Sequence, residues 1–208
     1  MKHKNNKQLY QYWNEIKDGQ RMPDRSALHP SALGPLLGDM FILNNDEEAL
    51  VPTYRLAGTR LCALYAHDLK HLPFAHHWSG RDRIACEEIT RNLGDDGQGM
   101  IIGSMARSRK GRMVHLETLL LPLMHQGQPG CRIVGSTTAL EQMDWLGADP
   151  IVEMEVSSLR MLRPNSTNAF DANRPLPVSP SPVLASQAMA GRRIKHLVVM
   201  DGGRTGSI

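Results

Sequence analysis

The chain has 208 residues, of which 41% are hydrophobic and 5% aromatic, a size that suits one domain with tails or two small domains. The formal net charge is +3 and arises in residues 191–208, where Arg192, Arg193, Lys195 and Arg204 stand against one acid, Asp201. The rest of the chain is neutral, which argues against a nucleic-acid partner, since such a protein would carry a broad basic stripe.

The sequence also predicts where the protein resides. The N-terminus lacks the apolar stretch of a signal peptide, and no apolar run approaches the roughly 18 residues of a membrane span. Three widely spaced cysteines, Cys62, Cys86 and Cys131, form no Cys-x-x-Cys pair and are typical of a reducing compartment. We therefore expect a cytoplasmic protein without membrane contact.

Apolar side chains spaced three and four residues apart predict a first helix over residues 7–18. Its apolar face is formed by Leu9, Trp13 and Ile16. These side chains can pack on the protein's own sheet, or they can form a dimer helix that pairs with a second subunit. A second short helix is expected at 30–36, because Pro30 suits the first turn of a helix.

Apolar runs with the character of extended chain, separated by turn residues, predict the strands of a sheet. Residues 39–44 and 51–58 are expected to form a hairpin, and a helical block follows at 59–93. Three further strands, joined by tight turns, are expected at 100–108, 113–124 and 131–139. An apolar sheet face must be buried, so the order predicts an α+β fold: a five-stranded antiparallel sheet with a helical insert on one face.

Composition divides the chain into five segments. They are N-terminal flanking helices at 1–38, a core domain at 39–140, a connecting segment at 141–163, a Pro/Ser-rich flexible linker at 164–190 and a basic C-terminal tail at 191–208. The connecting segment carries a mixed apolar pattern that suits a short strand or a helix. In the tail, residues 192–200 can form one strand.

Several local motifs resemble one protein family. They are Tyr12-Trp13, Gly19-Gln-Arg-Met-Pro-Asp-Arg-Ser26, Leu36–Leu43, Tyr54–Leu61, Phe74, Trp78, Gly111-Arg112, Glu117–Leu123 and Arg132–Gly135. Over residues 9–140 the chain resembles a bacterial, mainly alphaproteobacterial, PAS-domain family of small stand-alone signalling proteins, formerly catalogued as a domain of unknown function. The resemblance implies a PAS fold, signalling through protein contacts and no catalysis. Family members usually carry a glycine near Ala66, where a helix stops, so Ala66 leaves open a longer helix.

The PAS resemblance implies a pocket between the helical block and the inner face of the sheet. From fold analogy and from the alternation of side chains along each strand, we expect the pocket to be lined by Tyr54, Leu56, Trp78, Ile101, Leu116 and Ile133. Glu117 lies in an apolar strand, so its carboxylate must face solvent or find a partner. Arg55 and Arg132 on neighbouring strands are candidate partners, in a structural ion pair or as polar groups of the pocket.

Other chemistry finds little support. His67, His71, His76 and His77 lie close in sequence, but a metal site needs three or four converging ligands, and we interpret them as exposed loop residues. A haem-binding PAS domain uses a histidine on the helix before the last three strands, and residues 81–93 contain none, although His76 or His77 could reach inward. Cys62 lacks the Asn-Cys-Arg context of flavin adducts, and no catalytic motif occurs, so we predict neither metal nor catalytic residues.

The sequence therefore predicts a PAS signalling protein, a sensor or adaptor that is not an enzyme and needs no cofactor. Its expected partners are signalling proteins, namely a kinase, a response regulator or another PAS protein, and a second copy of the chain is a further option. One alternative is a PAS sensor that holds a small molecule or haem tightly. A small α+β enzyme is the third interpretation.

Overall fold

The structure is a computed structural model that describes residues 1–45, 50–94, 97–162, 192–194 and 197–201. The helices are α1 (Lys4–Glu15), α2 (Pro30–Leu33), α3 (Thr59–Tyr65) and α4 (Gly80–Arg91), with the 3-10 helices η1 (Arg25–Ala27), η2 (Gly34–Asp39) and η3 (Phe74–His77). The strands are β1 (Met40–Asn44), β2 (Thr53–Ala57), β3 (Gly99–Ser108), β4 (Met113–His125), β5 (Gln128–Ala139), β6 (Ile151–Leu162), β7 (Arg192–Ile194) and β8 (Leu197–Asp201). Within the described ranges, no helix combines the length and apolar character needed to span a membrane.

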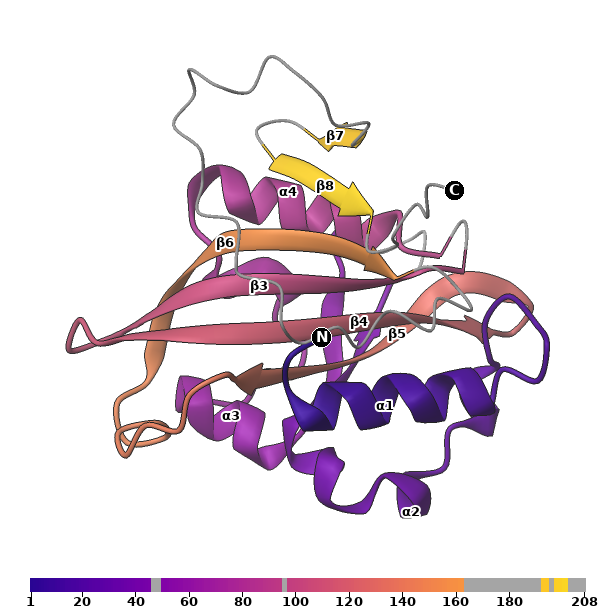
Figure 1. Cartoon of the computed structure of the whole chain (residues 1–208), viewed down its shortest axis with the longest axis horizontal. Helices are drawn as coiled ribbons and strands as arrows, with labels where there is room; N and C mark the ends of the chain where they lie inside the picture. Colours follow the sequence, from indigo (N-terminus) through magenta and orange to yellow (C-terminus); the bar gives the residue numbers. More distant parts are fainter. Residues whose placement is uncertain (46–49, 95–96, 163–191, 195–196, 202–208) are drawn as a thin grey trace, which may run out of the picture.

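The strands form one sheet in the order β2-β1-β5-β4-β3-β6-β8-β7, and Figure 1 shows β5, β4, β3 and β6 side by side. Neighbours from β2 to β6 are antiparallel, while β8 joins β6 in parallel opposite Arg160 and Met161. The α+β fold with its antiparallel sheet is confirmed, but the antiparallel part has six strands where the sequence predicted five.

The sixth strand, β6, lies in the connecting segment, where the sequence left open a short strand or a helix and counted no strand of the sheet. It pairs with β3 from Gly99 to Ser108, and the register between them shifts twice, after Gly103 and after Arg107. Each shift interrupts the alternation of inward and outward side chains that marks a strand in a sequence. The mixed apolar pattern of this segment therefore belongs to a long strand with two irregularities.

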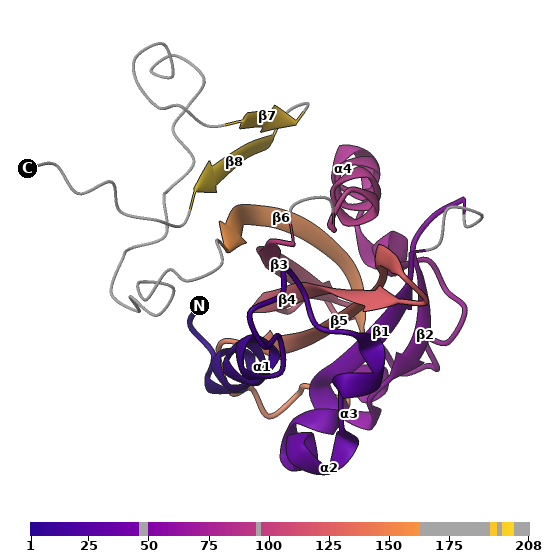
Figure 2. The ribbon, with the colours of Figure 1, turned by 90° about the vertical axis from the view of Figure 1, so that its right-hand side faces the viewer.

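The sheet is buried on both faces, with α1 and α4 on opposite sides (Figure 2). The inner core lies between the sheet and α3, η3 and α4, and includes Phe41, Tyr54, Phe74, Trp78, Leu116 and Ile133. The outer core lies under α1, α2 and η2, and includes Leu9, Trp13, Ile101, Leu119, Leu121 and Val134. The helical insert covers one face as expected, and the N-terminal helices cover the other.

Helix α3 stops at Tyr65 although no glycine follows. Ala66 adopts the left-handed conformation, with φ 58° and ψ 28°. The amides of Ala66 and His67 donate to the carbonyls of Ala63 and Cys62 at 3.2 and 3.3 Å, which closes the helix end. The longer helix that the sequence left open therefore does not form. The alanine occupies a backbone position that favours glycine.

The C-terminal part is described only in pieces. The Pro/Ser-rich segment 164–190, expected to be a flexible linker, lies outside the described residues. Of the basic tail 191–208, the structure describes the backbone of β7 and β8, which pair antiparallel with Ile194 opposite Leu197. In place of the one strand expected at 192–200, the described residues form two short antiparallel strands.

Candidate functional site

Four of the six nominated pocket residues come together in the inner core. They are Tyr54, Trp78, Leu116 and Ile133, which lie on β2, before α4, on β4 and on β5. Their side chains are buried and pack with those of the helical insert. The sequence thus identified the inner face through these four positions, and a ligand there stays a prediction.

The other two nominations are wrong because strand parity fails at both. Ile101 pairs with Leu119 and belongs to the outer core, on the opposite face of the sheet. Leu56 pairs with Ile42, whereas Tyr54 pairs with Leu43, so a β-bulge at Arg55 separates the two. The bulge turns Leu56 away from the inner core, and its side chain is 50% exposed.

Aromatic rings fill the part of the inner core that lies next to β1 and β2. Phe41 contacts Tyr54 and Phe74 at centroid distances of 5.5 and 5.7 Å. Phe74 in turn contacts Trp78 at 5.0 Å. Burial raises the pKa of the Tyr54 phenol, so this hydroxyl stays neutral. The protein's own rings therefore occupy much of the interior that the helical insert covers.

Two polar atoms in the inner core lack a hydrogen-bond partner in the described part of the chain: Trp78 Nε1 and Ser104 Oγ. Trp78 is 2% and Ser104 1% exposed, so neither group reaches solvent. Ser104 pairs with Leu116 and therefore faces the inner core. A buried polar group without a partner is costly, so these two atoms are the natural anchors for a small polar molecule or water.

A histidine cluster lies beside the inner core. His67 Nε2 is 3.2 Å from His77 Nε2, and the His77 ring stacks on Tyr65 at a centroid distance of 4.0 Å. Burial, with smaller contributions from His76 and His67, lowers the pKa of His77 to about 3. The prediction that all four histidines are exposed is therefore wrong for His77, which is buried. In the described ranges no group of three His, Cys, Asp or Glu side chains could hold a metal ion.

The cysteines lack the features of reactive thiols. Burial raises the pKa of Cys86 far above its ordinary value, helped by Asp82 and Glu87. Cys62 is partly buried and packs against the inner core. Both side chains therefore contribute to the packing of the inner core.

Glu117 is the centre of a buried polar site on the other face of the sheet. Its carboxylate is 3% exposed and accepts hydrogen bonds from the backbone amides of Lys2 and His3 and from Asn6 Nδ2, at 2.8, 3.1 and 3.0 Å. Arg160 Nη2 lies 3.7 Å from Oε2. A carboxylate at the start of a helix interacts favourably with the free amides and the helix dipole. Glu117 therefore fixes the beginning of α1 on the sheet.

The predicted partners of Glu117 are wrong. Glu117 pairs with Thr138 across the sheet, while Arg132 pairs with Leu123 near the other end of the same two strands. Arg55 lies on β2, at the edge of the sheet. Both arginines line one surface pocket together with residues of η1, well away from Glu117. The sequence identified the need for a partner but placed it on the wrong elements.

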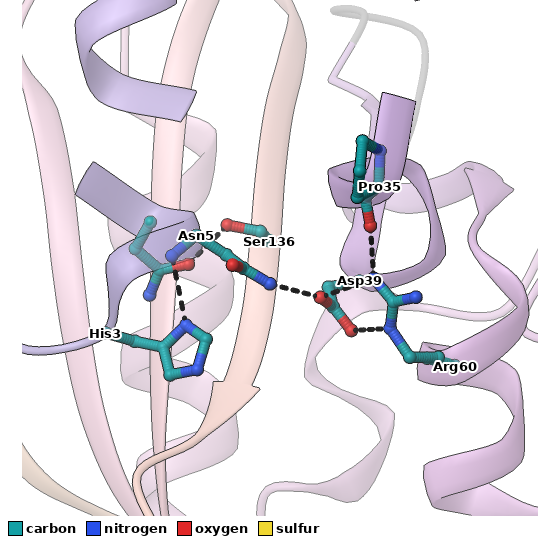
Figure 3. Close-up of polar contacts among 7 residues, drawn as sticks. His3, Asn5, Pro35, Asp39, Arg60 and Ser136 are labelled. Atoms are coloured by element: carbon teal, nitrogen blue, oxygen red, sulfur yellow. Dashed lines mark hydrogen bonds and ion pairs between the residues drawn. The ribbon is translucent and has the colours of Figure 1, made fainter. Parts of the chain in front are cut away.

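Asp39 is a second polar junction that the sequence did not indicate (Figure 3). Its carboxylate accepts Asn5 Nδ2 from α1 at 2.7 Å and Arg60 Nε from α3 at 2.7 Å. Arg60 also donates to the Pro35 carbonyl. The hydrogen bond with Asp39 raises the pKa of Arg60. Asp39 therefore links the helix on the outer face to the first helix of the insert.

The proposed dimer helix faces its own sheet. Leu9 and Trp13 are buried in the outer core, and Ile16 packs against it. Trp13 Nε1 donates to the Pro122 carbonyl at 2.9 Å. These three side chains are occupied within the chain, so a dimer would have to use another face of α1.

A comparison with family models finds one match, to a model described as a PAS domain, over residues 1–138. No curated protein and no solved structure matches the chain. The matched region includes α1, the helical insert and the strands up to β5, which contribute to both cores, while β6 lies beyond it. A PAS domain supports a sensory or signalling role. The chain belongs to the PAS-domain family.

Proposed function

We propose that the chain is a cytoplasmic, non-catalytic signalling adaptor that acts through contacts with a kinase, a response regulator or another PAS protein. The observation that carries this proposal is the filled inner core. Phe41, Tyr54, Phe74 and Trp78 contact one another at centroid distances of 5.0 to 5.9 Å where a ligand-loaded PAS domain would need space. A domain whose interior holds its own rings would transmit a signal through its surface.

The docking of α1 offers a mechanism. Glu117 and Asp39 hold the start of α1 on the sheet and beside α3 through hydrogen bonds to Lys2, Asn6 and Asn5. Breaking these bonds would release the helix and expose the outer core. A partner that binds one of the two states better would shift their populations by its difference in affinity. The adaptor would then report partner binding as a change in α1.

A second candidate function is a sensor that binds a small molecule in the inner core. The unpartnered atoms Trp78 Nε1 and Ser104 Oγ favour it, because together they present a donor and a hydroxyl inside an apolar interior. A small ligand with a polar group could accept from the indole or bond the hydroxyl. This candidate needs a change in ring packing that the adaptor does not need.

Native mass spectrometry of freshly purified protein separates the two functions. For the adaptor we expect the mass of the chain or of a multiple of it. An added stoichiometric mass that disappears in the Ser104→Ala variant would contradict the adaptor and support the sensor. Ser31→Ala is a matched control, since Ser31 is exposed, lies on α2 and is outside the inner core.

Partner binding needs a second experiment. Photo-crosslinking residues placed at the exposed positions Leu56 and Ile84 would capture a contact in the cell, and the captured protein would then be purified and titrated against the chain. We expect saturable binding that changes when Glu117→Gln loosens α1. Absence of saturable binding by every captured protein would overturn the adaptor function.

A further inference from the structure

A surface pocket of about 290 Å³ lies between η1 and the sheet. It is lined by Asp24, Arg25, Ser26, Arg55, His125 and Arg132. These residues come from η1 and its cap, from β2, from the end of β4 and from the start of β5. Four separate elements thus place their side chains around one small hollow.

The lining carries a surplus of positive charge. Three arginines stand against a single carboxylate, that of Asp24. Asp24 Oδ1 accepts hydrogen bonds from the Ser26 amide and hydroxyl at 2.8 and 2.6 Å, so this oxygen is engaged in capping η1. The carboxylate offsets one of the three positive charges, so the lining keeps a net positive charge. Arg132 Nη1 also donates to the Cys131 carbonyl at 2.8 Å.

Within the described part of the chain, Arg25 interacts electrostatically with Asp24 but forms no close ion pair, and neither does Arg55. Four other arginines, Arg60, Arg107, Arg112 and Arg160, each lie within 4.0 Å of a carboxylate. Arg25 and Arg55 have no such ion pair among the described residues, although they line the same pocket. An arginine that stabilises a fold more commonly pairs with a carboxylate, as Arg60, Arg107, Arg112 and Arg160 do.

The backbone of β2 is shaped around Arg55. Because Tyr54 pairs with Leu43 and Leu56 pairs with Ile42, Arg55 is the extra residue of a β-bulge and has no partner on β1. A bulge re-aims the side chain that it carries, at the cost of a regular ladder. Here it brings a guanidinium from the sheet edge to the same pocket as Arg132.

We propose that this pocket binds a small phosphate-bearing metabolite, with Arg25, Arg55 and Arg132 as its phosphate ligands. The planar guanidinium pairs with phosphate oxygens through two parallel hydrogen bonds, and several such groups around one hollow favour a dianion. A volume of about 290 Å³ suits a small ligand, and the lining offers no Phe, Tyr or Trp ring on which a nucleobase could stack.

The site joins two parts of the fold that the signalling mechanism would separate. Arg25 follows α1 in the N-terminal segment, which attaches to the sheet through the Met124 amide and the Pro23 carbonyl at 2.9 Å. Arg55 and Arg132 belong to the sheet itself. An anion held by all three would stabilise the docked N-terminal segment, whether or not the protein acts as an adaptor.

Isothermal titration calorimetry with glycerol 3-phosphate and with inorganic phosphate tests the proposal at a fixed ionic strength, set with sodium chloride. We expect saturable binding of the phosphate ester by the wild type. Each of Arg55→Gln and Arg25→Gln should weaken it about tenfold, the effect of losing one charge-assisted contact. Arg81→Gln, an exposed arginine of α4 outside the pocket, should leave the affinity within about twofold.

Three outcomes would overturn the proposal. The first is no saturable binding of either phosphate compound at millimolar concentration. The second is an equal loss of affinity in Arg81→Gln, which would indicate general attraction by the surface. The third is binding only to phosphatidylcholine vesicles that contain phosphatidic acid, because the pocket would then recognise a lipid surface and not a soluble metabolite. Thermal unfolding without ligand checks that each variant is folded.

Discussion

Glu117 Oε2 accepts a hydrogen bond from the backbone amide of Lys2 at 2.8 Å. The bond joins β4 to the residue that begins the turn into α1, across 115 positions of sequence. The same carboxylate also accepts the amide of His3 and the side chain of Asn6. A helix that covers one face of a sheet is thus positioned at its first turn by one buried charge.

Changing Glu117 to Gln should destabilise the fold by about 1 to 3 kcal/mol. The amide has the same shape, but it has no charge for the helix start and turns an NH₂ group toward amide donors. Chemical denaturation measures the free energy of unfolding. The matched control is Glu153→Gln on β6, whose ion pair with Arg107 is exposed and should contribute less than about 1 kcal/mol. Equal effects of the two changes would contradict the anchoring role of Glu117.

Trp13→Ala should lower the free energy of unfolding by about 3 to 5 kcal/mol, because the ring fills the outer core and its Nε1 bonds Pro122. Trp13→Phe keeps part of the ring volume and should cost less. Denaturant titration gives both values, and light scattering after gel filtration gives the oligomeric state. A change in oligomeric state with unchanged stability would show that Trp13 is an interface residue.

The architecture could be predicted because its signals are local. Apolar spacing marked α1, glycine-containing turns separated β3, β4 and β5, and a run of motifs carried the family resemblance. The pocket residues that were predicted wrongly depend on strand registers between segments that lie far apart in the sequence. Leu56 was misplaced by a bulge that only the pairing of Ile42 and Leu43 reveals, and Ile101 by a register set between β3 and β4.

The polar sites were harder to predict. Asn5 and Asn6 stand in the polar stretch Lys-Asn-Asn-Lys, which is typical of an exposed helix start, yet Asn6 is fully buried against Glu117 and Ser136. Nothing in their spacing distinguishes them from solvated residues. Glu117 could be recognised as unusual because it interrupts an apolar strand, but its hydrogen-bond donors lie 111 to 115 positions away and follow from tertiary packing alone.

His77 should make the stability depend on pH. Its folded pKa is lowered to about 3 from 6.5, so below pH 6.5 the unfolded chain binds a proton that the folded chain excludes. Stability from this group is therefore complete above pH 6.5 and falls as the pH drops toward 3, by up to about 1.4 kcal/mol per pH unit. The groups that face His77 are Tyr65, His67 and His76.

The measurement is the free energy of unfolding at pH 6.5 and pH 5.0 for the wild type and for His77→Phe, which keeps a ring against Tyr65. The wild type should lose about 2 kcal/mol more than this variant over the interval. The control is His29→Phe, an exposed histidine outside the histidine cluster, which should retain the wild-type dependence. Parallel pH curves for the wild type and His77→Phe would show that His77 does not titrate differently in the two states.

Ala66→Gly should stabilise the protein. Ala66 has φ 58°, and a side chain in the left-handed region costs about 1 to 2 kcal/mol, which glycine avoids. Glycine also gains freedom in the unfolded chain, so the net gain should be about 0.5 to 1 kcal/mol. Ala63→Gly is the matched control, because Ala63 is exposed within α3, where glycine should cost about 1 kcal/mol. Opposite signs in thermal unfolding would confirm that α3 ends at this residue; destabilisation by both changes would mean that the helix continues through Ala66 in solution.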